Sequence, residues 1–287
     1  MTEPQASYGT ALVLGGGGVA GIAWELGILR GLADADPGLA ERVLGADVVI
    51  GTSAGASVGA QITSGVPLDE LYEAQLRPST SEIEVDVDAA KLFAEFATAQ
   101  TAASDAADAG RRIGALALAA DTVTPAVRLA AIKGRLPVPV WPDRRLLLTT
   151  VDAGTGERTV FTRASGAELV DAVAASGAVP GVWPPIAIGD HRYVDGGVRT
   201  MTNADLAAGA DRVLILQPLP TPSQPWGGDE ADLAALGPAA VYVISPDQAA
   251  LEAFGPNPLS PATRGPAARA GRALGATHAA AVAALWT

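Results

Sequence analysis

The segment ADVVIGTSAGASVGAQI, residues 46–62, joins a largely apolar run to a helical pattern through a short turn rich in glycine. The run at residues 46–50 lacks the alternation of a half-exposed strand, so it predicts a strand of a parallel sheet that is buried on both faces. Ser53 stands in the turn between Gly51 and Gly55. Two glycines let the chain turn sharply and push the serine hydroxyl out near a helix N-terminus. This Gly-x-Ser-x-Gly pattern predicts a nucleophilic serine; a tight turn with an N-capping serine is the alternative.

Further apolar runs predict strands, and helical patterns alternate with them. The runs lie at residues 11–14, 146–151, 159–162, 213–216 and 240–244, and a turn-rich linker between the second and third predicts a hairpin. Strands that alternate with helices indicate a three-layer α/β/α sandwich with a largely parallel central sheet. The Ala-rich stretch Leu68–Lys133 predicts a helical insertion, which either caps the site or completes a helical layer. We expect one domain over residues 1–287.

A glycine loop, GGGGVAG at residues 15–21, follows the first predicted strand. Glycines let the backbone approach a ligand closely and point successive amides into one concavity. One ligand that suits this device is the oxyanion of a tetrahedral acyl intermediate. The amides would then come from Gly16, Gly17 and Gly18.

The same loop also matches the dinucleotide-binding pattern G-x-G-x-x-G, through Gly16, Gly18 and Gly21. Asp34 and Asp36 follow at about the distance expected of an acid that binds a ribose. A nucleotide-binding oxidoreductase is therefore the main alternative function, although it gives no role to the serine turn.

A third motif, Asp195-Gly196-Gly197, follows the short apolar pair Tyr193-Val194. A carboxylate at the end of a strand, with two glycines after it, is little covered and can accept a proton from a nearby hydroxyl as a general base. Asp-Gly is also a strong signal for a hairpin turn, which is the purely structural reading.

The order of these three motifs resembles that of the patatin-like phospholipases. The segment AASGAVPGVWPP at residues 174–185 and Asn203, ahead of the Gly-Ala-Asp of residues 209–211, support the resemblance, which covers residues 11–217. It implies a patatin-like fold and a serine esterase that cleaves lipid esters without a cofactor. It also implies that Ser53 is the nucleophile, Asp195 its only dyad partner, and Gly16–Gly18 the oxyanion hole.

One residue departs from the family pattern. The glycine loop of the family usually has a basic residue just before its last glycine, and here that residue is Ala20. Phosphate-bearing substrates are therefore less expected than ester cleavage itself. A non-catalytic lipid-binding relative is a further alternative.

The chain has two histidines and no cysteine. Ser53, Asp195 and His278 follow the chain order of an α/β-hydrolase triad, but His278 lies in an Ala-rich tail without the strand-end loop such a base needs. His191 is expected to be a solvated residue at a hairpin tip. Without thiolates or an HExxH pattern, no metal site is expected.

The amino-acid composition indicates which partners and which cellular location are expected. The formal net charge of −12 disfavours a nucleic-acid partner, and 49% hydrophobic residues supply a large core. No apolar run reaches the roughly 20 residues that span a bilayer, and the N-terminus lacks the basic start of a signal peptide, so a cytoplasmic protein is expected. No oligomeric state is predicted.

Two surfaces complete the expectations. Two interpretations are open for Val182, Trp183, Ile186 and the apolar faces of residues 89–133: they line an acyl pocket or, as is favoured, they form ordinary core. A basic face on the last helix, with Arg264, Arg269, Arg272 and Trp286, is a candidate for peripheral contact with a membrane, and an ordinary Arg-bearing surface helix is the favoured interpretation.

Overall fold

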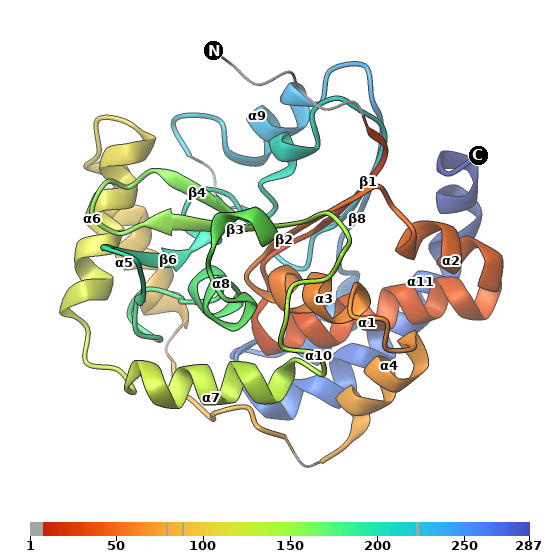
Figure 1. Ribbon diagram of the computed structural model, residues 1–287, viewed down its shortest axis with the longest axis horizontal. Helices are drawn as coiled ribbons and strands as arrows, with labels where there is room; N and C mark the ends of the chain where they lie inside the picture. The colour runs from red at the N-terminus through yellow and green to blue at the C-terminus, as the bar shows by residue number, and fades with distance from the viewer. Residues whose placement is uncertain (1–7, 79, 88, 222–223) are drawn as a thin grey trace.

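The computed structural model describes residues 8–78, 80–87, 89–221 and 224–287. The expectation that the N-terminus is no signal peptide concerns mainly residues 1–7, which lie outside these ranges. A sheet with the strand order β5-β6-β3-β2-β1-β7-β8 forms the centre, and β4 pairs with β3 (Figure 1). The strands are β1 (Tyr8–Leu14), β2 (Val48–Thr52), β3 (Leu146–Asp152), β4 (Arg158–Phe161), β5 (Ile186–Ile188), β6 (His191–Asp195), β7 (Ala210–Leu216) and β8 (Ala240–Ile244).

The predicted fold class is confirmed: β3, β2, β1, β7 and β8 run parallel, with helices on both faces of the sheet. The long helices are α1 (Gly18–Ala35), α2 (Pro37–Leu44), α3 (Ala54–Ile62), α4 (Leu68–Leu76), α5 (Ala89–Thr101), α6 (Ala106–Ala119), α7 (Pro125–Arg135), α8 (Leu169–Ser176), α9 (Gly228–Ala235), α10 (Gln248–Phe254) and α11 (Arg264–Leu285). Two short 3-10 turns, η2 (Gly196–Val198) and η3 (Ala204–Ala207), follow β6.

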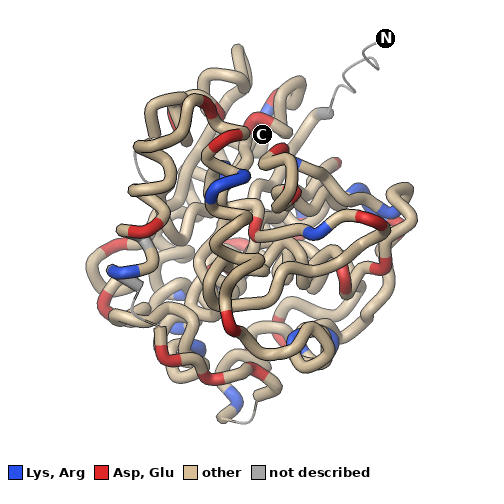
Figure 2. The backbone as a smooth tube through the Cα atoms, turned by 90° about the vertical axis from the view of Figure 1, so that its left-hand side faces the viewer, with Lys and Arg blue, Asp and Glu red and all other residues tan. Residues whose placement is uncertain are grey.

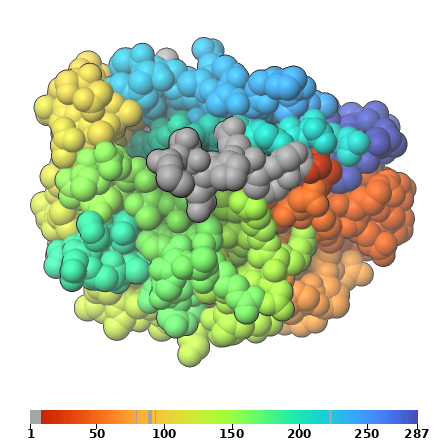
Figure 3. All heavy atoms as spheres, turned by 45° about the horizontal axis from the view of Figure 1, so that its top comes forward, coloured from red at the N-terminus to blue at the C-terminus, as the bar shows by residue number. Residues whose placement is uncertain are grey.

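The two faces of β1 show why this strand carries no polar side chain at its centre. Leu12 and Leu14 join the larger core, which contains residues of α1, α3, α8, α10 and α11. Ala11 and Val13 join a smaller core on the opposite face, where η3 and Leu236, just after α9, lie. A strand covered on both faces needs apolar residues at successive positions, as the sequence indicated. Figure 3 shows the segment around α9 (blue) along the top of one face and green segments from the middle of the chain across its lower half.

The thicker helical layer depends on the pairing of α1 with α11, which lie side by side (Figure 1). Glycines on both helices make this approach close. A Cβ atom on Gly31 would lie 2.1 Å from the carbonyl oxygen of Arg272, and one on Gly275 would lie 2.3 Å from that of Ile28. The small residues of the Ala- and Gly-rich tail therefore allow α11 to pack closely against α1. The stretch from Leu68 is helical as predicted, and forms α4, α5, α6 and α7.

Candidate active site

The serine turn forms a sharp connection between β2 and α3. Ser53 has φ 55° and ψ −108°, and it is one of two non-glycine residues with positive φ in the described part of the chain. A Cβ atom on Gly51 would lie 2.5 Å from the carbonyl oxygen of Gly55, and one on Gly55 would lie 2.0 Å from that of Leu14. The two glycines are thus required by the close approach of β1, β2 and α3, and the strained serine between them is typical of a nucleophile turn.

Sheet pairing brings the two predicted catalytic residues together. β2 runs parallel to β3 and β6 runs antiparallel to it, and both pair with β3. Thr52 pairs with Thr149, and Asp195 pairs with the next residue, Thr150. The carboxyl ends of β2 and β6 therefore meet along β3, which places Ser53, directly after Thr52, beside Asp195.

Asp195 is buried, with 5% of its surface exposed. Its Oδ1 accepts a hydrogen bond from the amide of Gly197 at 2.8 Å. Burial raises the pKa of Asp195 to about 6, against the opposing effects of a hydrogen bond with the Ser53 hydroxyl, the Gly197 amide and the positive charge of Arg128. A carboxylate with a pKa near neutrality is a stronger base toward a serine hydroxyl than an ordinary aspartate.

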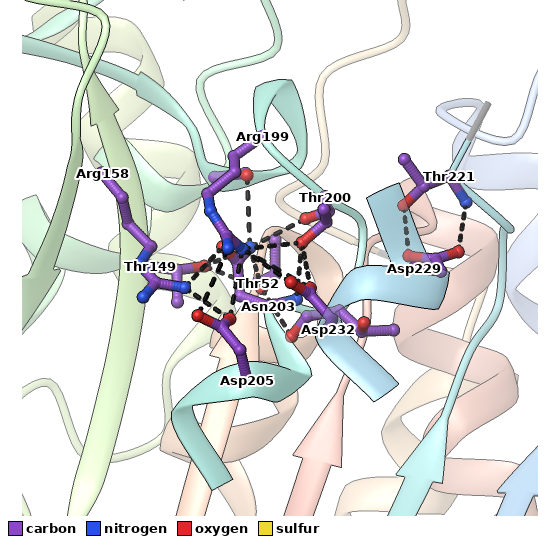
Figure 4. A network of polar contacts seen from close by, with 12 residues as sticks. Thr52, Thr149, Arg158, Arg199, Thr200, Asn203, Asp205, Thr221, Asp229 and Asp232 are labelled. Carbon is purple, nitrogen blue, oxygen red and sulfur yellow. Dashed lines mark hydrogen bonds and ion pairs between the residues drawn. The ribbon is translucent and has the colours of Figure 1, made fainter. Parts of the chain in front are cut away.

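A buried polar network stands behind the dyad and fixes the ends of its strands (Figure 4). Asn203, in the left-handed conformation, donates from Nδ2 to the Thr52 hydroxyl at 3.2 Å and to the carbonyl oxygen of Gly196 at 3.2 Å. The hydroxyls of Thr52 and Thr149 lie 2.7 Å apart. One amide thereby ties the serine turn to the aspartate turn, a role that the sequence motif did not reveal.

The same network continues to the surface through an ionic cluster that sequence reasoning missed. Arg199 contacts Asp205 at 3.1 Å and Asp232 at 3.1 Å, and Asp232 accepts a hydrogen bond from the Thr200 hydroxyl at 2.6 Å (Figure 4). Arg199, Thr200 and Asp205 lie in the segment after β6, whereas Asp232 lies on α9, so the residues of the cluster meet only in the folded chain.

The glycine loop needs one correction. The amide of Gly16 already donates to the carbonyl oxygen of Met201 at 2.8 Å, so it is not available to an oxyanion. The amides of Gly17 and Gly18 have no acceptor among the described residues. Gly18 has φ 64°, a conformation that favours glycine. The predicted trio is reduced to two donors because Gly16 is used to attach the loop to the segment after η2.

An apolar cavity of about 410 Å³ opens onto Ser53 and Asp195. This volume lies in the range of small-molecule sites. The apolar side chains of its lining are Val87, Leu92, Phe96, Ile113, Val179, Val198, Met201, Leu219 and Leu259. Residues of α5 and α6 contribute, as expected of the insertion. Val182, Trp183 and Ile186 belong to the core, which was the favoured expectation, and they do not line this cavity.

Neither histidine supports a triad. Nδ1 of His278 lies 2.8 Å from the Tyr242 hydroxyl of the sheet-edge strand β8. Nδ1 of His191 lies 2.6 Å from Oδ2 of Asp152, so this histidine is paired rather than only solvated. The described residues contain no cluster of three or more His, Asp or Glu side chains arranged to hold a metal ion.

The two acids expected to bind a ribose do not support a dinucleotide site. Asp34 lies near the end of α1 and pairs with Arg272 of α11 and with Arg30. Asp36 ends the same helix, instead of following a second strand as a ribose-binding acid does.

Of the four residues of the candidate basic face, Arg269 is exposed and Arg272 is partly exposed, but the other two are buried. Arg264 is buried and donates to the carbonyl oxygens of Ala74 and Arg77. Trp286 is buried and donates to the carbonyl oxygen of Arg42. The helix uses these side chains for packing because it is covered by α1 and α4 together. Within the described ranges, no helix is long and apolar enough to cross a membrane.

Comparisons with known proteins place the chain in a family. A model of the family described as patatin-like phospholipase matches residues 12–208, more than half of the chain. No curated protein matches. Among solved structures, VipD from Legionella pneumophila is similar at 12% identity and a TM-score of 0.46, over 97% of this chain and 67% of its own. The type III effector protein ExoU is similar at 16% identity and a TM-score of 0.45, over 96% of this chain and 53% of its own, so this chain spans about half of it. On the match over residues 12–208, the chain belongs to the patatin-like phospholipase family.

Proposed function

We propose that this chain is a serine acyl hydrolase that cleaves carboxylic esters of lipids, with Ser53 as nucleophile and Asp195 as its proton acceptor. One observation carries the proposal: a strained serine and a buried carboxylate adjoin the same apolar cavity. An apolar cavity of this kind suits an acyl chain, and family membership supports the hydrolase class.

The residues divide the reaction into two steps. Oγ of Ser53 attacks the ester carbonyl carbon while its proton moves to Asp195, and the carbonyl electron pair moves onto oxygen. The amide of Gly18, in the glycine loop, donates to that oxyanion. The intermediate then collapses, the alcohol leaves with the proton from Asp195, and an acyl-serine remains. In the second step, water gives a proton to Asp195 and attacks the acyl carbon. The carboxylic acid is released as Oγ of Ser53 leaves and takes the proton from Asp195.

The test is hydrolysis of p-nitrophenyl esters of increasing chain length by the wild type and by Ser53→Ala. We expect turnover that rises from acetate to medium chains and is lost in Ser53→Ala, while the melting temperature is unchanged. Equal turnover by both proteins would refute the assignment of Ser53. A wild type that binds the esters without turnover would support the alternative, a non-catalytic lipid-binding relative.

A further inference from the structure

A second, much smaller cavity lies on another side of Ser53. Its volume is about 20 Å³, which is the space of one water molecule or one ligand oxygen atom. It shares four wall residues with the acyl cavity: Gly18, Ser53, Val179 and Leu259. An oxygen attached to a carbon that Ser53 attacks is a group of the right size for this space.

Two helices begin at this small cavity. Gly18 and Val19 open α1 and Ala54 opens α3, and all three residues line the cavity. None of their amides has an acceptor in the described part of the chain. First-turn amides carry the positive end of a helix dipole, so both helices favour negative charge here.

Arg128 of α7 adds a full positive charge to the same cavity. Its side chain is buried, with 3% of the residue surface exposed, and its guanidinium lies 4.0 Å from the centre of the Trp183 ring. Nη2 donates to the carbonyl oxygen of Gly177 at 3.3 Å. Nε and Nη1 have no partner among the described residues. Two charged donors are therefore held beside Ser53 without an acceptor.

The two acids nearest to Arg128, Glu82 and Asp195, favour its charged form electrostatically, but neither accepts a hydrogen bond from its Nε or Nη1. Arg135, two turns further along α7, also lines the small cavity, but it binds Glu82 through two hydrogen bonds of 2.9 and 2.6 Å and donates to Ser57 at 2.9 Å. Glu82 is thus already paired. Burial, and then the charge of Arg135, lower the pKa of Arg128 to about 9 against the opposing charges of Glu82 and Asp195, so it is still a cation at neutral pH.

A buried cation without a paired carboxylate is unfavourable for folding and needs another explanation. The chain does not lack acids: Asp and Glu positions (red) are spread over the whole backbone in Figure 2, and the net charge is −12. Ala20 of the glycine loop is fully buried and brings no charge to this place. The cation beside the loop comes instead from α7, which lies next to α8 in Figure 1.

We propose that the small cavity receives the oxyanion of the tetrahedral intermediate and that Arg128 donates to it together with the amides of Gly18 and Ala54. This inference rests on the proposed hydrolase function. When the bond between Oγ of Ser53 and the carbonyl carbon forms, the carbonyl electron pair moves onto the oxygen facing Arg128. The proton goes to Asp195, and the charge returns to the carbonyl when the alcohol leaves. A charged donor present before the reaction needs no reorganisation as the negative charge develops.

The test compares Arg128→Met with Lys133→Gln, which removes an exposed positive charge from the same helix. Methionine fills much of the space over Trp183 without charge. For a medium-chain p-nitrophenyl ester, we expect kcat of Arg128→Met to fall about 10²-fold or more, with KM changed only a few-fold. Its melting temperature is expected to stay equal or rise, because an unpaired buried charge is removed. Lys133→Gln should match the wild type in both measurements.

A second variant, Arg128→Ala, leaves space for a free guanidinium ion, and millimolar guanidinium is expected to restore part of its kcat without activating the wild type. A kcat of Arg128→Met within about threefold of the wild type would overturn this inference alone and leave the hydrolase proposal standing. Activity lost only in proportion to a lowered melting temperature, without rescue, would assign Arg128 a structural role and also overturn it. Absence of any Ser53-dependent turnover in the wild type would overturn both proposals.

Discussion

Thr52 and Asp195 pair with consecutive residues of the same strand, Thr149 and Thr150 of β3. β2 and β6 approach this strand from opposite directions, so their carboxyl ends meet. A nucleophile turn after one strand and a carboxylate at the end of the other then lie side by side without a third catalytic element. The arrangement supports the proposed dyad, which needs no histidine.

Activity should titrate with the carboxylate of Asp195. Burial raises its pKa to about 6, and only the ionised form accepts the proton of Ser53. We expect kcat/KM to be constant above neutrality and to fall about tenfold per pH unit below pH 6. The measurement is a pH profile of ester hydrolysis for the wild type, His191→Gln and His278→Gln. A histidine variant without this acid limb, or without activity, would contradict the dyad.

Asp195→Asn should remove activity and stabilise the fold. Because folding raises this pKa, the wild type is penalised when the carboxyl must ionise, so the penalty is absent below about pH 4 and complete above about pH 6. The difference between the ordinary value of 3.8 and about 6 corresponds to at most about 3 kcal/mol. Urea unfolding at pH 4 and pH 8 measures the effect. A variant less stable than the wild type at pH 8 would show that the hydrogen bonds of Asp195 outweigh its burial.

Much of this site could be predicted from local sequence. Ser53 and Asp195 stand in short motifs whose glycines are required by backbone contacts within a few residues or with one neighbouring strand. Arg128 has no such signal: it lies in the Ala-rich insertion, 75 residues after Ser53, and only the packing of α7 brings it to the serine. The burial of Arg264, in the candidate basic face of α11, has a similar cause. Helical periodicity does not reveal that two helices, α1 and α4, cover Arg264 and its neighbours.

The occupied amide of Gly16 illustrates the same limit. A run of glycines predicts a concave loop, but which amide is free depends on the segment that packs against it. Here that segment is Met201, far along the chain.

Gly55→Ala should disrupt the serine turn. The new Cβ atom would lie 2.0 Å from the carbonyl oxygen of Leu14, and neither backbone can retreat easily from the sheet. We expect a loss of more than about 2 kcal/mol in the free energy of unfolding, with activity lost at the same time. Gly38→Ala in α2, whose Cβ would meet nothing closer than 3.4 Å, is the matched control. Equal stability of the two variants would contradict the tight turn.

The variant Asn203→Gly distinguishes the role of the Asn203 side-chain amide from that of its backbone conformation. Glycine keeps the left-handed conformation at φ 49° and removes the donations to Thr52 and Gly196. Thermal and urea unfolding should show a loss of about 1–3 kcal/mol. The kcat should fall by more than the decrease in the fraction of folded protein explains, because no side chain then links the serine turn to the aspartate turn. An unchanged kcat would mean that the network stabilises the fold alone.

Leu92→Trp tests the acyl cavity. Leu92 lies on α5 in the cavity lining, so a larger side chain there should reduce the length of acyl chain that the cavity can hold. We expect kcat/KM for octanoate to fall at least about tenfold relative to acetate, since roughly 1–3 kcal/mol of pocket contact is removed. The control is Leu116→Trp on the exposed face of α6. If both variants keep the chain-length preference of the wild type, the cavity does not hold the acyl chain.

The most direct test of the dyad is labelling with an alkyl fluorophosphonate, followed by intact-mass and peptide analysis. Attack by Oγ of Ser53 forms an oxygen–phosphorus bond and expels fluoride, so each chain should gain one adduct, located on Ser53. Asp195→Asn should slow this labelling strongly, and Ser53→Ala should abolish it. An adduct on another residue, or undiminished labelling of Ser53→Ala, would contradict the assignment of Ser53 as the nucleophile.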